Sequence, residues 1–238
     1  MPEPALYLIP VSLDDATDPK EVLPEGVLRL MAQLDEFIVE NARSARRFLR
    51  KAGHAKDFDQ VTLHILDKHT PITEASTYLQ SLKKGMAVGL LSEAGTPCIA
   101  DPGAQIVRLC QEQAIKVVPL TGPSSILLAL MASGFNGQNF AFNGYLPIHK
   151  QELKKKLKEL ELAALAQDQT QIFIETPYRN NQMLEMIVSV CSESTRLCVA
   201  AEITTPREKI LTQTIRAWKK QLPDLHKKPT VFLIYQGA

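Results

Sequence analysis

Short apolar runs alternate with helix-like patterns through the first two thirds of the chain. The apolar runs are rich in β-branched residues and predict buried strands at residues 5–11, 36–40, 87–93 and 116–121. Segments with apolar residues at helical spacing lie between and after them, at residues 26–34, 42–52, 72–83, 104–114 and 124–133. Because parallel strands are joined by crossover helices, this order predicts an α/β domain whose mainly parallel sheet is covered on both faces.

A second pattern begins after a strand predicted at residues 140–146. Pro147 precedes a lysine-rich segment, residues 150–166, in which Leu153, Leu157 and Leu160 share one helical face. The remaining elements are strands expected at residues 171–176, 196–203, 209–213 and 230–235, and helices expected at residues 181–191 and around Trp218. We therefore expect two α/β domains, a mainly parallel one at residues 1–148 and a smaller one with a mixed sheet at residues 149–238.

The composition is that of a globular protein. Of the 238 residues, 45% are hydrophobic and 22% charged, and the formal net charge is +1, which excludes disorder and a polyanion-binding surface over the whole molecule. The four cysteines form no C-x-x-C pair, so neither a disulfide framework nor a zinc knuckle is indicated. The N-terminal sequence lacks the charged and apolar order of a signal peptide, and the apolar runs are far shorter than a membrane span of roughly 20 residues. We expect a cytoplasmic protein.

Two loops rich in small residues and proline follow predicted strands. Residues 89–103 read GLLSEAGTPCIADPG, and residues 120–125 read LTGPSS. In open α/β sheets, ligands bind beyond the carboxyl ends of the strands, where glycine lets the backbone approach them closely. We interpret the loops as a pocket formed at two adjacent strand ends; the alternative is that they only cap their strands. The chain has neither a Walker A loop nor a G-x-G-x-x-G after its first strand, so a nucleoside cofactor would be held in another way.

The ordered set of motifs resembles a known family. SEAGTPCIADPG, VVPLTGPSS, FAFNGYLP, IFIETPYR and AEIT follow one another as in the tetrapyrrole methylase family of S-adenosylmethionine-dependent methyltransferases. Within it, the pattern is most similar to the ribosomal RNA small subunit methyltransferase I subfamily. The resemblance implies a two-domain α/β enzyme, usually a homodimer, that binds S-adenosylmethionine in the cleft between its domains.

The resemblance also assigns residues to the cofactor. These are Pro10, Ser92, Glu93, Ala94, Gly95, Thr96, Ser124, Ser125, Ile126, Ile174, Ala201 and Thr204. Their chemistry suits this ligand, since S-adenosylmethionine needs a carboxylate or carbonyls for its ammonium, polar donors for its carboxylate and ribose, and apolar walls for adenine. Glu93 replaces the aspartate of the family, which keeps the charge and adds one methylene group.

The acceptor side departs from the family pattern. Pro10 is followed by Val-Ser-Leu-Asp-Asp where the subfamily has I-G-N. Of the subfamily's A-E-D-T-R only Glu40 and Arg43 remain, and of its H-E-H-N only His69. Because a ribose hydroxyl must lose a proton when it is methylated, Glu40 and His69 are candidate general bases, and Arg43 is a candidate anchor or charge stabiliser.

A basic helix and two histidines complete the candidate chemistry. Arg43, Arg46 or Arg47, and Arg50 share one face of the helix expected at residues 42–52, which either neutralises phosphates or is a solvated surface. His64 and His69 lie in a strand-like segment on opposite faces, so we expect no metal site.

Three functions agree with these observations. The first is methylation of ribosomal RNA, at the 2′-hydroxyl of a cytidine in 16S rRNA, with the RNA or the small ribosomal subunit as partner. The second is methylation of another acceptor, a tetrapyrrole or a different RNA, by the same fold. The third is a non-catalytic RNA-binding relative.

Overall fold

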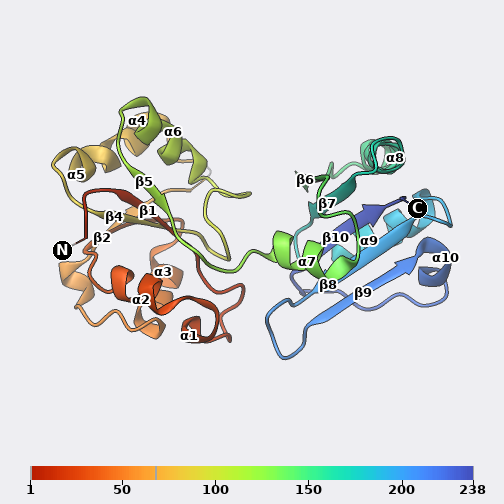
Figure 1. Ribbon diagram of the computed structural model, residues 1–238, viewed down its shortest axis with the longest axis horizontal. Helices are drawn as coiled ribbons and strands as arrows, with labels where there is room; N and C mark the ends of the chain where they lie inside the picture. The colour runs from red at the N-terminus through yellow and green to blue at the C-terminus, as the bar shows by residue number, and fades with distance from the viewer. Residues whose placement is uncertain (1, 68, 238) are drawn as a thin grey trace. The chain divides into compact units, whose positions relative to one another are not determined.

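The computed structural model describes residues 2–67 and 69–237, which form two compact units (Figure 1). The division falls between Ser124 and Ser125, and we refer to the N-terminal unit and the C-terminal unit. The boundary expected at residue 148 is therefore corrected. Helix α7 (Ser125–Ser133) packs against strands of the C-terminal sheet, and β6 (Phe140–Tyr145) is itself a strand of that sheet. The change in composition after Pro147 marks only the start of a surface helix.

The N-terminal unit contains a parallel sheet. Its strands are β1 (Leu6–Ile9), β2 (Glu36–Val39), β3 (Thr62–Ile65), β4 (Val88–Leu91) and β5 (Val117–Pro119). Their order is β3-β2-β4-β1-β5, and every neighbouring pair is parallel, which confirms the expected sheet type. The two small-residue loops follow β4 and β5, and β1 lies between these strands. The expectation that the loops follow adjacent strands is therefore wrong.

Helices cover both faces of this sheet. They are α1 (Pro19–Val22), α2 (Glu25–Met31), α3 (Ala42–Lys51), α4 (Ile72–Ala75), α5 (Gln80–Lys83) and α6 (Ala104–Glu112), with 3₁₀ turns at Phe58–Gln60 and Ser76–Leu79. One buried cluster contains Met31 and Leu49, and a separate one contains Leu79 and Ile106, so two apolar layers enclose the sheet. The single helix expected at residues 72–83 is broken, because the hydroxyls of Ser76 and Thr77 donate to backbone carbonyls one turn earlier.

The C-terminal unit contains a mixed sheet. Its strands are β6, β7 (Thr170–Ile174), β8 (Arg196–Ala201), β9 (Lys209–Thr214) and β10 (Thr230–Tyr235), in the order β6-β7-β10-β8-β9. Only β6 and β7 pair in parallel; the other neighbours are antiparallel, which confirms the expected mixed sheet. Helices α8 (Lys150–Ala166), α9 (Asn180–Val190) and α10 (Ile215–Trp218) complete the unit, whose core includes the stacked pair Phe173 and Phe232.

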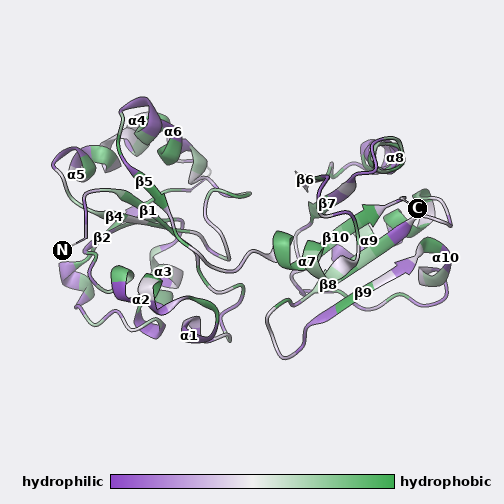
Figure 2. Ribbon diagram, viewed as in Figure 1, coloured by the Kyte–Doolittle hydropathy of each residue, from purple (hydrophilic) through white to green (hydrophobic). Residues whose placement is uncertain are grey.

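Apolar residues are concentrated in the inner strands and in α7, which Figure 2 shows as green ribbon. Among the described residues, no helix has both the length and the apolar character that crossing a bilayer requires.

Candidate functional site

The carboxyl ends of the parallel strands bring most of the predicted N-terminal residues to one edge of the sheet. Pro10 follows β1, Glu40 follows β2, and Ser92 to Thr96 follow β4. The segment that contains Gly122 follows β5, and His69 lies beyond the end of β3. This edge is where open α/β sheets bind ligands.

The loop after β4 is held by its own hydrogen bonds. The carbonyl oxygen of Gly95 accepts from the Ser92 hydroxyl at 2.7 Å and from the backbone N–H of Val11 at 2.9 Å. Gly95 has a φ of +68°, and a Cβ atom there would lie 2.9 Å from a methyl group of Leu13. The positive φ therefore favours glycine at this position, and hydrogen bonds within the chain define the turn.

The loop after β5 packs against the end of β1. A Cβ atom on Gly122 would lie 2.3 Å from Cβ of Pro10, so the two backbones approach as closely as glycine permits. The hydroxyl of Thr96 donates to the carbonyl of Pro123 at 3.5 Å, which joins the loops after β4 and β5. The three strand ends thus form one packed structure, although β1 separates β4 from β5.

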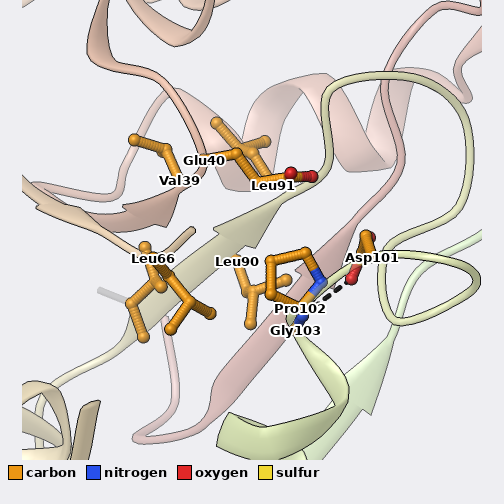
Figure 3. Close-up of a pocket in the computed structure, with 9 residues that line it drawn as sticks. Val39, Glu40, Leu66, Leu90, Leu91, Asp101, Pro102 and Gly103 are labelled. Carbon is orange, nitrogen blue, oxygen red and sulfur yellow. Dashed lines mark hydrogen bonds between the residues drawn. The ribbon is translucent and has the colours of Figure 1, made fainter. Parts of the chain in front are cut away.

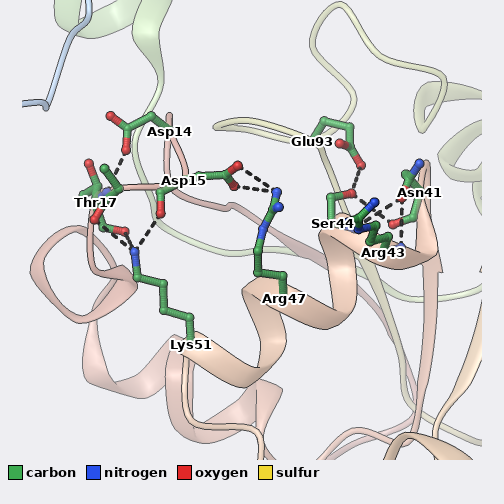
Figure 4. Close-up of polar contacts among 10 residues, drawn as sticks. Asp14, Asp15, Thr17, Asn41, Arg43, Ser44, Arg47, Lys51 and Glu93 are labelled. Atoms are coloured by element: carbon green, nitrogen blue, oxygen red, sulfur yellow. Dashed lines mark hydrogen bonds and ion pairs between the residues drawn. The ribbon is translucent and has the colours of Figure 1, made fainter.

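Glu93 connects this structure to helix α3. Its Oε1 accepts from the Ser44 hydroxyl at 2.7 Å, and Ser44 lies in the first turn of α3, whose N-cap is Asn41 (Figure 4). The side chain of Asn41 accepts from the backbone N–H groups of Arg43 and Ser44. Sequence reasoning did not find this contact, because Ser44 and Glu93 lie on different elements and neither belongs to a joint motif.

Glu40 is a titratable residue at this edge whose pKa is strongly changed by its surroundings. It lines a small hollow together with Leu66, Leu90 and Asp101 (Figure 3). Burial, and then the negative charges of Asp101 and Glu93, raise the pKa of Glu40 to about 7, although the N–H of Glu93 partly stabilises the carboxylate. A carboxyl group with this pKa can exchange protons near neutral pH.

Asp101 is a residue of the site that sequence reasoning missed. Its carboxylate accepts from the N–H of Cys98 at 2.9 Å and from the N–H of Gly103 at 2.7 Å. These bonds fix a turn in which Cys98 and Ala100 have φ values of 68° and 61°. Burial raises the pKa of Asp101, and the bonds from Gly103 and Cys98 oppose this. The sequence signal was the Asp-Pro-Gly that ends the loop.

The other two catalytic candidates lie at the surface. Arg43 is exposed in the first turn of α3, and His69 is exposed in a turn where its N–H donates to Asp67 at 2.8 Å. His69 therefore lies outside β3, and the expectation that it shares a strand with His64 is wrong. His64 is within β3 and contacts Glu36 at 2.7 Å. Among residues 2–67 and 69–237, no group of three or more His, Cys, Asp or Glu side chains could hold a metal ion.

Part of the basic face of α3 is used within the protein. Arg47 forms two hydrogen bonds to Asp15, at 2.9 and 2.7 Å, and Lys51 donates to the backbone carbonyls of residues 15–17 (Figure 4). Arg50 donates to the carbonyl of His54 and lies over the ring of Phe58. Arg47 and Lys51 hold the end of the segment that departs from the subfamily pattern after Pro10. All three cations have partners within the protein and contribute less to a phosphate-binding face than the sequence predicts.

The remaining predicted cofactor residues lie at the unit boundary or in the C-terminal unit. Ser124 is the last residue of the N-terminal unit, and Ser125 and Ile126 begin α7. Ile174 ends β7, and Ala201 ends β8. Thr204 has a φ of 69° in a turn after β8, where the Arg207 guanidinium donates to Glu202 at 2.7 Å.

Comparison with known proteins gives one family. Residues 17–218 match the family of Tetrapyrrole (Corrin/Porphyrin) Methylases. The chain is 32% identical over 235 residues to the Ribosomal RNA small subunit methyltransferase I of Escherichia coli O157:H7, and the match covers 98% of this chain and 77% of that protein. It is also 32% identical over 232 residues to the protein of the same name from Haemophilus influenzae, a match that covers 96% of this chain and 77% of that protein.

A solved structure shares the fold. The crystal structure of the methyltransferase CobJ matches with a TM-score of 0.65 and 18% sequence identity, covering 98% of this chain and 95% of that one. At this identity, the similarity concerns the architecture only.

Proposed function

Because the chain belongs to the tetrapyrrole methylase family of S-adenosylmethionine-dependent methyltransferases, we propose that it methylates ribosomal RNA, at the 2′-hydroxyl of a cytidine in 16S rRNA. The supporting observation is the 32% identity over 98% of the chain to a protein named for the small-subunit RNA. Identity to CobJ is only 18% over a similar share. The match to the RNA enzyme therefore extends to sequence, and the match to CobJ to architecture alone.

The N-terminal unit offers groups that fit the cofactor. Glu93 supplies an exposed carboxylate for the ammonium group, and the Thr96 hydroxyl suits a ribose or carboxylate oxygen. A Cβ atom on Gly122 would lie 2.3 Å from Pro10, and one on Gly95 would lie 3.3 Å from the carbonyl oxygen of Pro123, so both turns are closely packed. Ala94 presents a small exposed side chain. Pro10 and Ser92 support the turns. From the resemblance, we also assign to the cofactor Ser124, Ser125, Ile126, Ile174, Ala201 and Thr204.

The protein's own work concerns the acceptor. The cofactor, when bound, supplies an activated sulfonium methyl group, so no covalent nucleophile is required of the chain. Aligning the acceptor oxygen with the methyl group accounts for roughly 7 to 11 kcal/mol of the barrier. As the new O–CH₃ bond forms and the S–CH₃ bond breaks, Glu40 accepts the hydroxyl proton, for which a pKa of about 7 is well suited.

Arg43 and His69 have lesser roles in this proposal. Arg43, exposed beside the N-terminus of α3, anchors a phosphate of the acceptor. His69 is the alternative base, but it is exposed in a surface turn, whereas Glu40 is half-buried and lines the hollow at the strand ends.

A second acceptor remains a candidate because of one local feature. The segment that replaces the subfamily's Gly-Asn is anchored to α3 by Arg47 and Lys51. Because this segment differs from that of the subfamily, the acceptor-binding surface beside it would differ as well, which favours a different RNA or a tetrapyrrole as substrate. The same fold with the same cofactor would serve either.

Methyl transfer to isolated subunits tests the proposal. The purified protein is incubated with radiolabelled S-adenosylmethionine and small ribosomal subunits from a strain that lacks this methylation. We expect label in 16S rRNA, mapped to one cytidine by nuclease digestion and mass spectrometry. Label in another RNA or in a tetrapyrrole would support the second acceptor. Cofactor binding without transfer to any of these would support a non-catalytic RNA-binding relative.

We also propose a cytoplasmic homodimer, as the family resemblance implies. Sedimentation equilibrium of the purified protein distinguishes a monomer from a dimer, because one chain has a mass of 26.4 kDa. Cell fractionation with a tagged chain tests the compartment.

A further inference from the structure

Tyr178 is a strongly exposed aromatic residue of the C-terminal unit. It is 68% exposed, more than Tyr145 at 57% or Phe140 at 40%. It follows Pro177 between β7 and α9. Because most of the Tyr178 ring is in contact with water, a partner that covers it would remove apolar surface from water and gain binding free energy.

Two side chains from a distant segment surround this ring. The ammonium group of Lys227 lies 5.9 Å from the ring centroid, and the ring of His226 meets it edge to face with centroids 6.0 Å apart. Both neighbours are themselves exposed. The surface therefore combines an aromatic ring with a cation. Proteins that bind single-stranded nucleic acids use this combination, in which the ring stacks on a base and the cation pairs with a phosphate.

The segment that carries these neighbours is fixed by hydrogen bonds to the start of α9. The N–H of Lys227 donates to the carbonyl of Pro177 at 2.9 Å, and the side chain of Asn180 donates to the carbonyl of Lys228 at 2.6 Å. Asn181 donates to Asp224 at 2.8 Å and accepts from the N–H of Leu225 at 2.6 Å. The platform is thus ordered before any partner binds, which lowers the entropy cost of association.

The local charge favours an anionic partner. His226, Lys227 and Lys228 are consecutive, and Arg179 follows Tyr178. Arg179 is paired with Glu175 at 3.4 Å, and Asp224 is the acidic residue of the 224–228 segment. After these pairings, Lys227 still has its ammonium group at the surface beside the ring.

We propose that Tyr178 and Lys227 form a stacking platform for an unpaired base of an RNA acceptor, with Lys227 pairing to an adjacent phosphate. The inference rests on the proposed function and deepens it, because it names a feature of the RNA acceptor: a single-stranded segment with an unpaired base. The platform acts in acceptor binding, and the methyl-transfer chemistry does not involve it.

Fluorescence anisotropy with a labelled oligocytidylate RNA measures this binding directly. We expect Tyr178→Ala to raise the Kd about 5- to 150-fold, whereas Tyr178→Phe keeps the ring and stays within about 2-fold of the wild type. Lys227→Gln should lower the slope of log Kd against log salt by about 0.7. Tyr145→Ala is the matched control, since no cation lies over that ring among the described residues, and it should bind RNA as the wild type does.

The outcomes separate this inference from the proposed function. If the wild type binds and methylates RNA and Tyr178→Ala binds equally well, the platform is refuted while the function stands. If the wild type binds no RNA, both fail. A change in oligomeric mass with Tyr178→Ala, at unchanged RNA affinity, would assign the ring to a protein contact and overturn the proposal. Fluorescence of Trp218, in the same unit, verifies that each variant is folded.

Discussion

Gly122 is the position where one added methyl group tests the packing of the candidate site. Its Cβ atom in Gly122→Ala would lie 2.3 Å from Cβ and 2.7 Å from Cγ of Pro10, and 3.0 Å from a methyl group of Leu23. Carbon atoms pack at about 3.5 Å or more, so the loop or Pro10 must move by about 1.2 Å (3.5 − 2.3). Leu23 can change rotamer, but the Pro10 ring is buried and part of the backbone.

The cost follows from overpacking. Inserting a methyl group into a closely packed site costs about 1 to 3 kcal/mol of unfolding free energy. A shift of about 1 Å in the loops that we propose hold the cofactor should also lower methyl transfer by on the order of 10²-fold. Gly26→Ala is the control, because Gly26 lies in α2 with no atom within 4 Å of its added Cβ. It should be neutral or stabilising by up to about 1 kcal/mol.

Urea unfolding followed by far-ultraviolet circular dichroism gives the unfolding free energy, and calorimetry with S-adenosylhomocysteine gives the affinity for the cofactor site. Gly122→Ala should unfold at lower urea and bind more weakly, with Gly26→Ala unchanged in affinity. Equal stability and equal affinity for the two variants would show that Pro10 yields easily and that the three strand ends are not packed as described.

Three further predictions concern side chains. In the wild type, the rate of methyl transfer should rise as pH increases through about 7, because Glu40 accepts a proton only when it is deprotonated. Glu40→Gln should lower kcat about 10²- to 10⁴-fold and should lose this pH dependence. A rise that persists in the variant would exclude Glu40 as the base. Ser44→Ala should weaken cofactor binding about 2- to 12-fold by calorimetry, since it releases Glu93, and no change would show that the tether is dispensable. Although burial alone would raise the pKa of Glu161, hydrogen bonds from Thr195 and Ser192, together with Lys158, lower it below 4.5. The stability that ionised Glu161 contributes is therefore present above pH 4.5 and is lost as pH falls through its lower folded-state pKa. In Glu161→Gln, the unfolding free energy should depend less on pH over this acidic range. An unchanged dependence of the unfolding free energy on pH would contradict the assignment.

The periodic patterns were sufficient to predict most of the sheet elements. Strands such as β1, β4 and β10 are apolar on both faces, so they appear as continuous runs in the sequence. The edge strand β3 was recognised only as a strand-like segment around His64, with no bounds, since Thr62 and Ile65 are exposed and its run is short. Edge strands face water on one side and give a weaker signal.

The unit boundary and the site contacts depend on tertiary structure. Helix α7 is apolar over most of its surface, and nothing in residues 125–133 says which sheet it covers. Glycine and proline in the sequence marked the loop after β4. The hydroxyl of Ser44, however, reaches Glu93 because α3 follows β2 and β2 is the neighbour of β4 in the sheet. Long-range pairs of this kind, including Asp15 with Arg47, leave no periodic signal.

The carbonyl oxygen of Gly95 accepts two hydrogen bonds from within the protein, and this has a consequence for turnover. Because Val11 and Ser92 shape that turn without help from a ligand, its backbone should keep the same form when fresh donor replaces spent product. Each exchange of product for a new cofactor molecule would then require no change in the backbone conformation of this turn. Hydrogen–deuterium exchange of the Val11 amide, which donates to Gly95, should accordingly be slow even in the free enzyme and change little when the cofactor is saturating.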